Sequence, residues 1–133
     1  MIWRNATSSL LSIATTLILS STALAVEAPQ LTRLSQTEVA EQMQQLPGWT
    51  TDGQRIDCTY EFENFVEAIA FVDRLVAPAE AAGHHPDIAI AYNKVTVSLT
   101  THDAGGLTEQ DFALALQIAQ LSLTANEGCQ STR

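Results

Sequence analysis

Two kinds of hydrophobic spacing alternate along the chain from residue 35 onward. Ser35 and Glu38 have the arrangement of a capping box, in which the two side chains satisfy the first free amides of a helix. Apolar residues then recur at helical intervals until Pro47 and Gly48. Every second position of 55–62 is apolar and a turn sequence at 52–53 precedes it, which predicts a hairpin.

Helical spacing returns over 64–82, and Gly83 is the expected terminator of this long central helix. Pro78 lies inside it and removes one backbone hydrogen bond, so we expect a kink near 74–77. The apolar positions predicted to face the core are Phe65, Ile69, Val72, Val76 and Ala79.

A second hairpin and a third helix complete the pattern. The segments 87–92 and 94–101 alternate between apolar and polar residues around Asn93. A helix then begins after Thr108, with an expected apolar stripe of Phe112, Leu116, Ala119 and Leu123. The order α-β-β-α-β-β-α predicts a single α+β domain, in which helices pack on one face of a four-stranded antiparallel sheet. An edge strand with an apolar face would favour self-association, so we expect an oligomer.

The first 25 residues have the form of an export signal. Arg4 precedes ten mostly apolar residues, 10–19, and Ala23-Leu24-Ala25 gives a small-x-small cleavage site. Removal of residues 1–25 would leave a domain of residues 26–133 in the periplasm, a lumen or the medium. An uncleaved anchor and a misassigned start are the alternatives, although the apolar run is short for a membrane span.

Composition limits the partners. A chain of 133 residues has room for one domain, and its formal charge of −9 leaves no basic patch for nucleic acid. Cys58 and Cys129 lack the spacing of a metal site. In an oxidising compartment they could form one disulfide, and otherwise Cys58 is a small core residue and Cys129 a free thiol.

The three histidines of the chain, His84, His85 and His102, flank the second hairpin. Gly83 and Pro86 place the first two in a short helix-to-strand joint, where both side chains can face one cleft. An antiparallel hairpin returns the end of its second strand to the start of its first, so His102 should approach them. We therefore expect the three imidazoles to meet.

Several kinds of chemistry could use this cluster. Imidazole can donate and accept protons near neutral pH, and Glu80 and Asp111 are placed to orient the rings. Alternatively, the three rings could bind zinc with Asp87, Asp103 or Glu80. Nucleophilic catalysis has no evident Ser or Cys beside a base. The fully structural alternative is that the histidines only cap elements or pair with nearby carboxylates.

The chemical residues also follow the signature of a known family. Glu80 is followed by His84-His85-Pro86, then Tyr92, His102 and Asp111 at fixed spacings. The sequence thereby resembles the pterin-4a-carbinolamine dehydratases, and the likeness extends over nearly the whole of 26–133.

The resemblance implies that the protein removes water from a 4a-hydroxytetrahydropterin to give the quinonoid dihydropterin, in tetrahydrobiopterin recycling or biosynthesis. It implies that His84 and His102 transfer protons, that His85 holds the pterin, and that Glu80 and Asp111 orient imidazoles. No metal or organic cofactor is implied, and the pterin is the small-molecule partner, with a homodimer or homotetramer as the assembly.

Two alternatives accompany the resemblance. Relatives usually look cytosolic, so a cytoplasmic location competes with the export implied by residues 1–25. Some relatives act as dimerisation partners or assembly factors, so a non-catalytic protein-binding module on the same fold is the second functional hypothesis.

Overall fold

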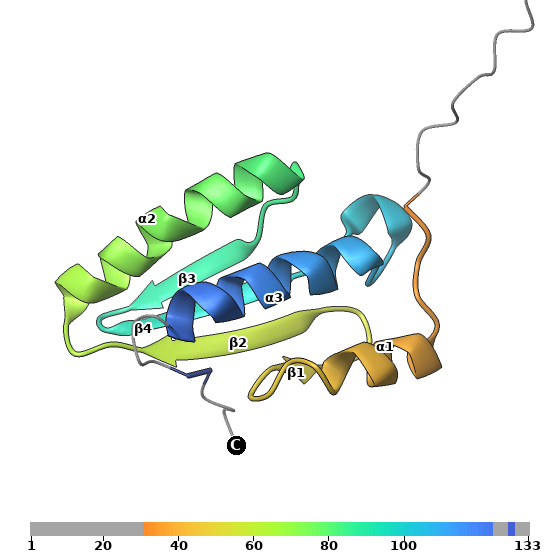
Figure 1. The fold of residues 1–133 in the computed structure, drawn as a ribbon, viewed down its shortest axis with the longest axis horizontal. Helices are drawn as coiled ribbons and strands as arrows, with labels where there is room; N and C mark the ends of the chain where they lie inside the picture. Colours follow the sequence, from red (N-terminus) through yellow and green to blue (C-terminus); the bar gives the residue numbers. More distant parts are fainter. Residues whose placement is uncertain (1–30, 124–127, 130–133) are drawn as a thin grey trace, which may run out of the picture.

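The computed structural model describes residues 31–123 and 128–129 and confirms the predicted α+β fold. The predicted export signal, 1–25, lies outside the described residues. Figure 1 shows α2 and α3 lying across one face of the sheet. The elements are α1 (Gln36–Met43), β1 (Thr50–Thr51), β2 (Ile56–Glu61), α2 (Phe65–Ala82), β3 (Asp87–Ala91), β4 (Lys94–Leu99), η1, a short 3-10 helix (His102–Ala104), and α3 (Glu109–Leu123).

The four strands form one antiparallel sheet in the order β1-β2-β4-β3. Within the second hairpin, Asp87 pairs with Ser98 and Ala91 with Lys94. The start of β3 and the end of β4 therefore lie at the same end of the sheet. This register brings the segments on either side of the hairpin together.

The predicted capping box is present at the start of α1. The Ser35 hydroxyl accepts from the Glu38 amide at 3.3 Å, and the Glu38 carboxylate accepts from the Ser35 amide at 2.8 Å. The hydrogen bonds from Ser35 lower the pKa of the Glu38 carboxyl. Local sequence therefore determines where this helix begins.

The predicted core face of α2 is wrong in part: Ala79 is buried and Val72 packs against the core as a partly buried side chain, but the other three residues are exposed. The helix buries Ala68, Phe71, Leu75 and Ala79, whereas Phe65, Ile69 and Val76 are 50%, 41% and 55% exposed. Both sets follow helical spacing, because this helix is apolar on more than one side. The helix also runs through Pro78 as one element from Phe65 to Ala82.

The predicted stripe of α3 is wrong in part for the same reason. Phe112 is buried as expected, but Leu116 and Ala119 are only partly buried. Their places in the core are taken by Leu114, Ala115 and Ile118. A helix with apolar residues on adjoining faces leaves the choice of the buried face to tertiary packing.

The core lies between the helices and one face of the sheet. Alternate residues of β2 and β4 point into it, as the strand pattern predicted. Tyr60 packs against Phe71 with ring centroids 4.8 Å apart, and Phe62 packs against the same ring at 5.0 Å. The fully buried aromatic and aliphatic side chains are Tyr60, Phe71, Phe112, Leu46, Ile56, Leu75, Leu99, Leu107, Leu114, Ile118, Val95 and Val97.

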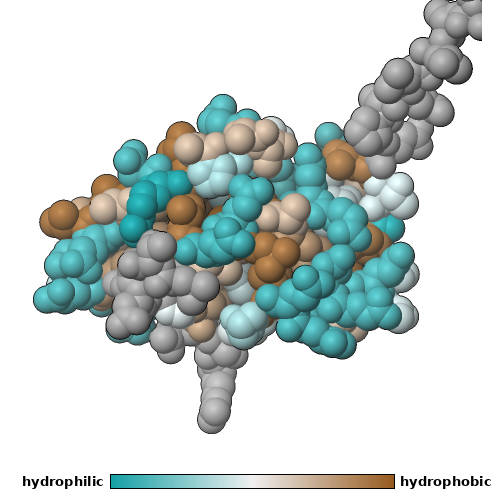
Figure 2. Space-filling model, in the orientation of Figure 1, coloured by the Kyte–Doolittle hydropathy of each residue, from teal (hydrophilic) through white to brown (hydrophobic). Residues whose placement is uncertain are grey.

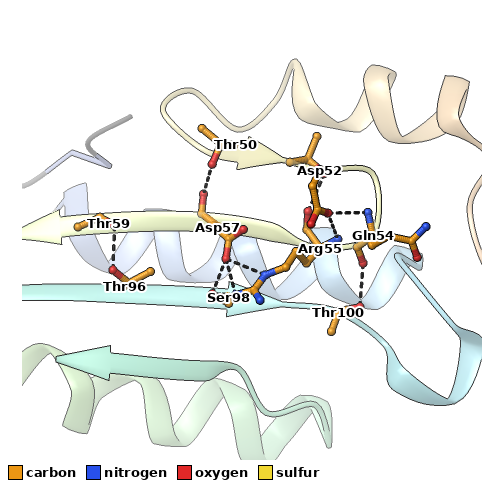
Figure 3. Close-up of polar contacts among 10 residues, drawn as sticks. Thr50, Asp52, Gln54, Arg55, Asp57, Thr59, Thr96, Ser98 and Thr100 are labelled. Carbon is orange, nitrogen blue, oxygen red and sulfur yellow. Dashed lines mark hydrogen bonds and ion pairs between the residues drawn. The ribbon is translucent and has the colours of Figure 1, made fainter. Parts of the chain in front are cut away.

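Polar side chains line the opposite face of the sheet (Figure 3). The hydroxyls of Thr59 and Thr96 are 2.9 Å apart across β2 and β4. Arg55 donates to Asp57 at 2.8 Å and to Ser98 at 2.6 Å, and Ser98 also donates to Asp57. The Asp57 carboxylate raises the pKa of the Arg55 guanidinium. This network satisfies the polar groups of a face that no described helix covers.

Cys58 of β2 is joined to Cys129 by a disulfide, which is the first of the two alternatives left open by the sequence. The bond ties residues 128–129 to the sheet across 71 positions of sequence. Among the residues that the structure describes, none of the helices has both the length and the hydrophobicity to cross a membrane.

Candidate active site

All three histidines line one pocket of about 330 Å³. The pocket lies where the helix-to-strand joint before β3 meets the segment after β4. Its lining also includes Leu31, Gly83, Thr100, Thr101, Asp103 and Gln110. The hairpin register thus places together the three rings that the sequence separates by up to 18 positions.

Gly83 sets the position of the first two histidines. Its φ of 58° is left-handed, and the Gly83 amide donates to the Glu80 carbonyl at 3.1 Å. The His84 amide donates to the Ala79 carbonyl, also at 3.1 Å. These two bonds end α2 and turn the chain so that His84 and His85 leave the helix towards the pocket.

His84 is held by a buried carboxylate. Its Nε2 lies 2.7 Å from Oδ1 of Asp111, and the Asp111 side chain has no exposed surface. The second oxygen, Oδ2, accepts from the Thr101 hydroxyl at 2.8 Å and from the Thr108 amide at 2.8 Å. Both oxygens are therefore occupied, and the carboxylate cannot rotate without breaking a hydrogen bond.

This arrangement selects one tautomer of His84. An ionised carboxylate only accepts hydrogen bonds, so Nε2 of His84 must donate to Asp111. The neutral ring then keeps its lone pair on Nδ1, which can accept a proton. His84, with a side chain 10% exposed, is thus an oriented proton acceptor at the edge of the pocket.

His85 is paired at the surface. Its Nε2 lies 2.8 Å from Oε1 of Glu80, and the two side chains are 63% and 69% exposed. Glu80 belongs to the last turn of α2, so the helix end orients this ring. Because both groups are solvated, the pair contributes little to the stability of the fold. Its main effect is to orient the His85 ring.

His102 begins the short helix η1 and is exposed. Within the described part of the chain, no side chain or backbone group makes a hydrogen bond to its ring. The strand end is fixed by Thr101, whose amide donates to the Gly106 carbonyl at 3.1 Å. The imidazole is thus positioned by its backbone and is exposed at the pocket.

Sequence reasoning missed several lining residues. Asp111 was expected to orient an imidazole, but the sequence did not indicate which of the three rings it would bind; in the structure it binds His84 and also accepts from the Thr108 amide. Thr101 gave no signal, because a lone threonine at a strand end has no pattern. Leu31, which is 46% exposed, precedes every predicted element and still lines the pocket.

The zinc alternative requires several ligands that converge on one point. Within residues 31–123 and 128–129, no three His, Cys, Asp or Glu side chains are grouped so that they could hold a metal ion. Nε2 of His84 and Nε2 of His85 are directed to carboxylates instead.

Comparison with known proteins defines the class to which this fold and site belong. The family model described as pterin 4 alpha carbinolamine dehydratase matches residues 32–121. The chain belongs to this family, whose members are hydro-lyases. The matched residues include all three histidines, Glu80 and Asp111.

Individual relatives agree with the family. A protein of a Cyanothece species is 62% identical over 89 residues, which are 67% of this chain and 92% of that protein. A Nostoc protein is 57% identical over 89 residues, 67% of this chain and 96% of its own length. Both carry the name "Putative pterin-4-alpha-carbinolamine dehydratase".

A solved structure is also similar. It is the crystal structure of a transcriptional coactivator/pterin dehydratase from Brucella melitensis, with a TM-score of 0.63 and 35% identity. The match covers 67% of this chain and 97% of the other.

Proposed function

We propose that this protein dehydrates a 4a-hydroxytetrahydropterin to the quinonoid dihydropterin in tetrahydrobiopterin recycling or biosynthesis. Family membership supports the substrate class. The observation that carries the proposal is the pocket in which a buried, oriented His84 lies beside two accessible histidines. The pterin is the substrate, and the reaction draws on side chains alone.

The reaction requires two proton movements. The bond between C4a and its oxygen breaks, and an acid supplies a proton so that the oxygen leaves as water. A base removes the proton on N5 as the C4a–N5 double bond forms, so atoms and charge balance. In this proposal His84 and His102 are the proton-transfer pair, and His85 holds and polarises the pterin. Asp111 orients His84, and Glu80 orients His85.

The test is the dehydration rate of a freshly generated 4a-hydroxytetrahydropterin, followed by absorbance. Replacing a general acid or base removes about 10²- to 10⁴-fold of rate, so we expect losses of that order in His84→Ala and His102→Ala. Gln117→Ala, an exposed change on α3, is the matched control. Wild-type rates in both folded histidine variants would overturn the proposal.

The protein-binding alternative is favoured by one observation, an exposed apolar surface. Val66, Ile69 and Val76 of α2 are 75%, 41% and 55% exposed. Figure 2 shows hydrophobic side chains interrupting the hydrophilic surface in this part of the molecule. A stoichiometric partner recovered with a chain that lacks dehydratase activity would support a non-catalytic module.

We also propose that a second copy of the chain covers this apolar surface. A groove of about 160 Å³ runs between α2 and β3, lined by Val72, Val76 and Ile88 among others. All five residues of β3 are exposed, and β3 is an edge of the sheet with unpaired backbone groups. A homodimer, or a homotetramer built from it, would bury both features.

We propose finally that the protein is exported and that residues 1–25 are removed. The disulfide between Cys58 and Cys129 supports an oxidising compartment, because such bonds are rare in the cytosol. N-terminal sequencing of the protein isolated from its host should find Val26 as the first residue. Soluble protein that begins at Met1 would contradict export.

A further inference from the structure

The segment between β4 and η1 carries a buried threonine that is connected to both sides of the histidine pocket. Thr101 is 5% exposed and directly precedes His102 in the chain. Its hydroxyl donates to Oδ2 of Asp111, the carboxylate whose other oxygen holds His84. Thr101 is therefore linked to both members of the proposed proton-transfer pair, to His84 through its side chain and to His102 through its backbone.

The number of available protons gives the hydrogen bonds of Thr101 a direction. A hydroxyl has one proton, and that of Thr101 goes to Asp111 over 2.8 Å. The Thr101 oxygen also lies 2.9 Å from the hydroxyl oxygen of Thr108, so Thr108 is the donor in that contact. The result is a chain of donors that runs from Thr108 through Thr101 and ends on the carboxylate of Asp111. Successive hydrogen bonds of this kind strengthen one another in a buried site.

The other donors to Oδ2 of Asp111 both belong to Thr108. The Thr108 amide lies at 2.8 Å, and the Thr108 hydroxyl lies farther away, at 3.3 Å. Thr108 directly precedes α3, which carries Asp111, so these two contacts are local to the start of that helix. The bond from Thr101 instead joins the carboxylate to the segment that follows β4. Rotation of the carboxylate would break this bond between the helix and the end of the sheet.

The backbone of Thr101 fixes the turn that carries His102. Its amide donates to the Gly106 carbonyl at 3.1 Å, and its carbonyl accepts from the Gly106 amide at 3.3 Å. The same carbonyl accepts from the Ala104 amide at 3.1 Å, which closes the single turn of η1. Because His102 is the first residue of η1 and is exposed at the pocket, these backbone bonds determine where its ring lies.

We propose that Thr101 is a positioning residue for the dehydration, an inference that rests on the proposed function of this pocket. Its hydroxyl fixes the Asp111 carboxylate and thereby the His84 ring, and its backbone places the His102 ring. The relative placement of the two rings thus depends on Thr101. Proton transfer requires each ring to lie within about 3 Å of the substrate atom that it serves. A small rotation of His84 therefore slows the chemical step more than it weakens substrate binding.

Thr101→Val tests the hydroxyl, because valine has nearly the same shape and cannot donate. We expect kcat for dehydration to fall about tenfold, the factor that a hydrogen bond to a charged group contributes, while KM changes by less than about twofold. Thr101→Ser keeps the hydroxyl and should recover most of kcat. Thr101→Ala removes the same hydroxyl and replaces the valine variant if that variant does not fold.

Thr96→Val is the matched control. It removes another threonine hydroxyl, on β4, whose partner is the Thr59 hydroxyl at 2.9 Å on the polar face of the sheet (Figure 3). This variant loses a hydroxyl contact of similar length that does not involve Asp111. It should therefore keep the kcat of the wild type.

Two measurements separate positioning from a general loss of structure. In a His84→Ala background, Thr101→Val should change the remaining rate by less than about twofold, because the hydroxyl acts through His84. The second measurement needs no substrate. The Nε2 proton of His84, donated to a buried carboxylate over 2.7 Å, should give a downfield ¹H NMR resonance that His84→Ala removes. Thr101→Ser should retain this resonance, and Thr101→Val should shift it or abolish it.

Three kinetic outcomes would overturn the proposal. These are an unchanged kcat in folded Thr101→Val, a Thr101→Ser variant as slow as the valine variant, and a full tenfold loss in the His84→Ala background. A folded wild type that does not dehydrate the pterin would contradict the proposed function instead. The resonance of His84 then tests Thr101 separately, and an identical resonance in the wild type and Thr101→Val would show that Thr101 does not position the ring.

Discussion

Asp111 is the residue that connects the fold to the chemistry. It caps the start of α3 through the Thr108 amide and holds His84 through its other oxygen. The same carboxylate therefore fixes a helix start and selects the tautomer of a proposed catalytic ring. A residue with two such roles cannot be replaced by its amide without consequence for one of them.

Asp111→Asn should lower the dehydration rate by at least about tenfold. The Thr108 amide requires an acceptor, so the asparagine oxygen remains there and its NH2 group faces Nε2 of His84. Nε2 must then accept, and the proton of the neutral ring moves to Nδ1. The rate and the ¹⁵N shifts of the imidazole measure this, with Asp73→Asn as the exposed control. An inverted tautomer with an unchanged rate would contradict the assigned role of Asp111.

Tyr60 should make the protein sensitive to alkaline pH. Burial raises the pKa of its hydroxyl to about 12, and hydrogen bonds with Ser122 and Trp49 act in the opposite direction. The folded state thus favours the neutral phenol, so its stabilising effect is complete below about pH 10 and is lost as the pH rises towards about 12. The loss should be roughly 2–3 kcal/mol of unfolding free energy over that interval.

Urea unfolding at pH 8 and near pH 11 measures this loss, with Tyr60→Phe as the matched variant. At pH 8 the variant should be within about 1 kcal/mol of the wild type, because the ring that fills the core is kept and a neutral hydrogen bond contributes about that much. At the higher pH it should be the more stable of the two. Equal alkaline losses in both proteins would show that another group is responsible.

At the scale of the element, α2 shapes both the histidine pocket and the exposed apolar surface of the molecule. Its end at Gly83 directs His84 and His85 to the pocket, and its second apolar stripe remains exposed. The ends of the helices could be predicted from the sequence, because capping boxes and glycine terminators act through neighbouring residues. The buried stripe of α2 could not be predicted in this way, because two sets of its apolar residues have helical spacing. Only the contacts of α2 with β4 and α3 determine which set is buried.

Gly83→Ala should destabilise the protein by about 1 kcal/mol and lower the dehydration rate. Space is not the cause, since an added Cβ would meet no atom within 4 Å. The cause is the φ of 58°, which a side chain with Cβ adopts at a cost. Gly83→Asn should recover part of the stability, because asparagine tolerates this conformation better. Urea unfolding and the rate are the measurements, and an alanine variant as stable as the wild type would refute the argument.

At the scale of the whole molecule, the sheet has one covered face, one polar face and one apolar edge. The Arg55–Asp57–Ser98 network satisfies the polar face, whereas no strand of the described residues pairs with the outer edge of β3 beside the groove. The disulfide ties residues 128–129 to β2, an inner strand of the sheet. The β3 side is therefore the surface that we propose for self-association.

Ile90→Lys should therefore separate the proposed assembly into single chains. Ile90 is 40% exposed on the edge strand, and a buried lysine there would lose its hydration without a counter-ion. Light scattering should give the wild type at least twice the mass of one chain, which is 14.4 kDa for all 133 residues and less after removal of 1–25, and the variant the mass of one chain. Ala113→Lys, exposed on α3, is the control and should assemble normally. A wild type with the mass of one chain would rule out the assembly.

The sequence by itself determined the order of the elements, the fold class and the five residues expected to act together. These predictions depend on short-range features, namely strand alternation, helix caps and the antiparallel pairing of hairpin strands, together with a motif shared by the family. Only the tertiary structure decided which stripes of α2 and α3 are buried and that Cys58 meets Cys129. It also decided that Asp111 binds His84 and not another of the three rings. These outcomes depend on which surfaces, distant in sequence, come into contact. A periodic pattern specifies the spacing of apolar residues but not the surface against which they pack.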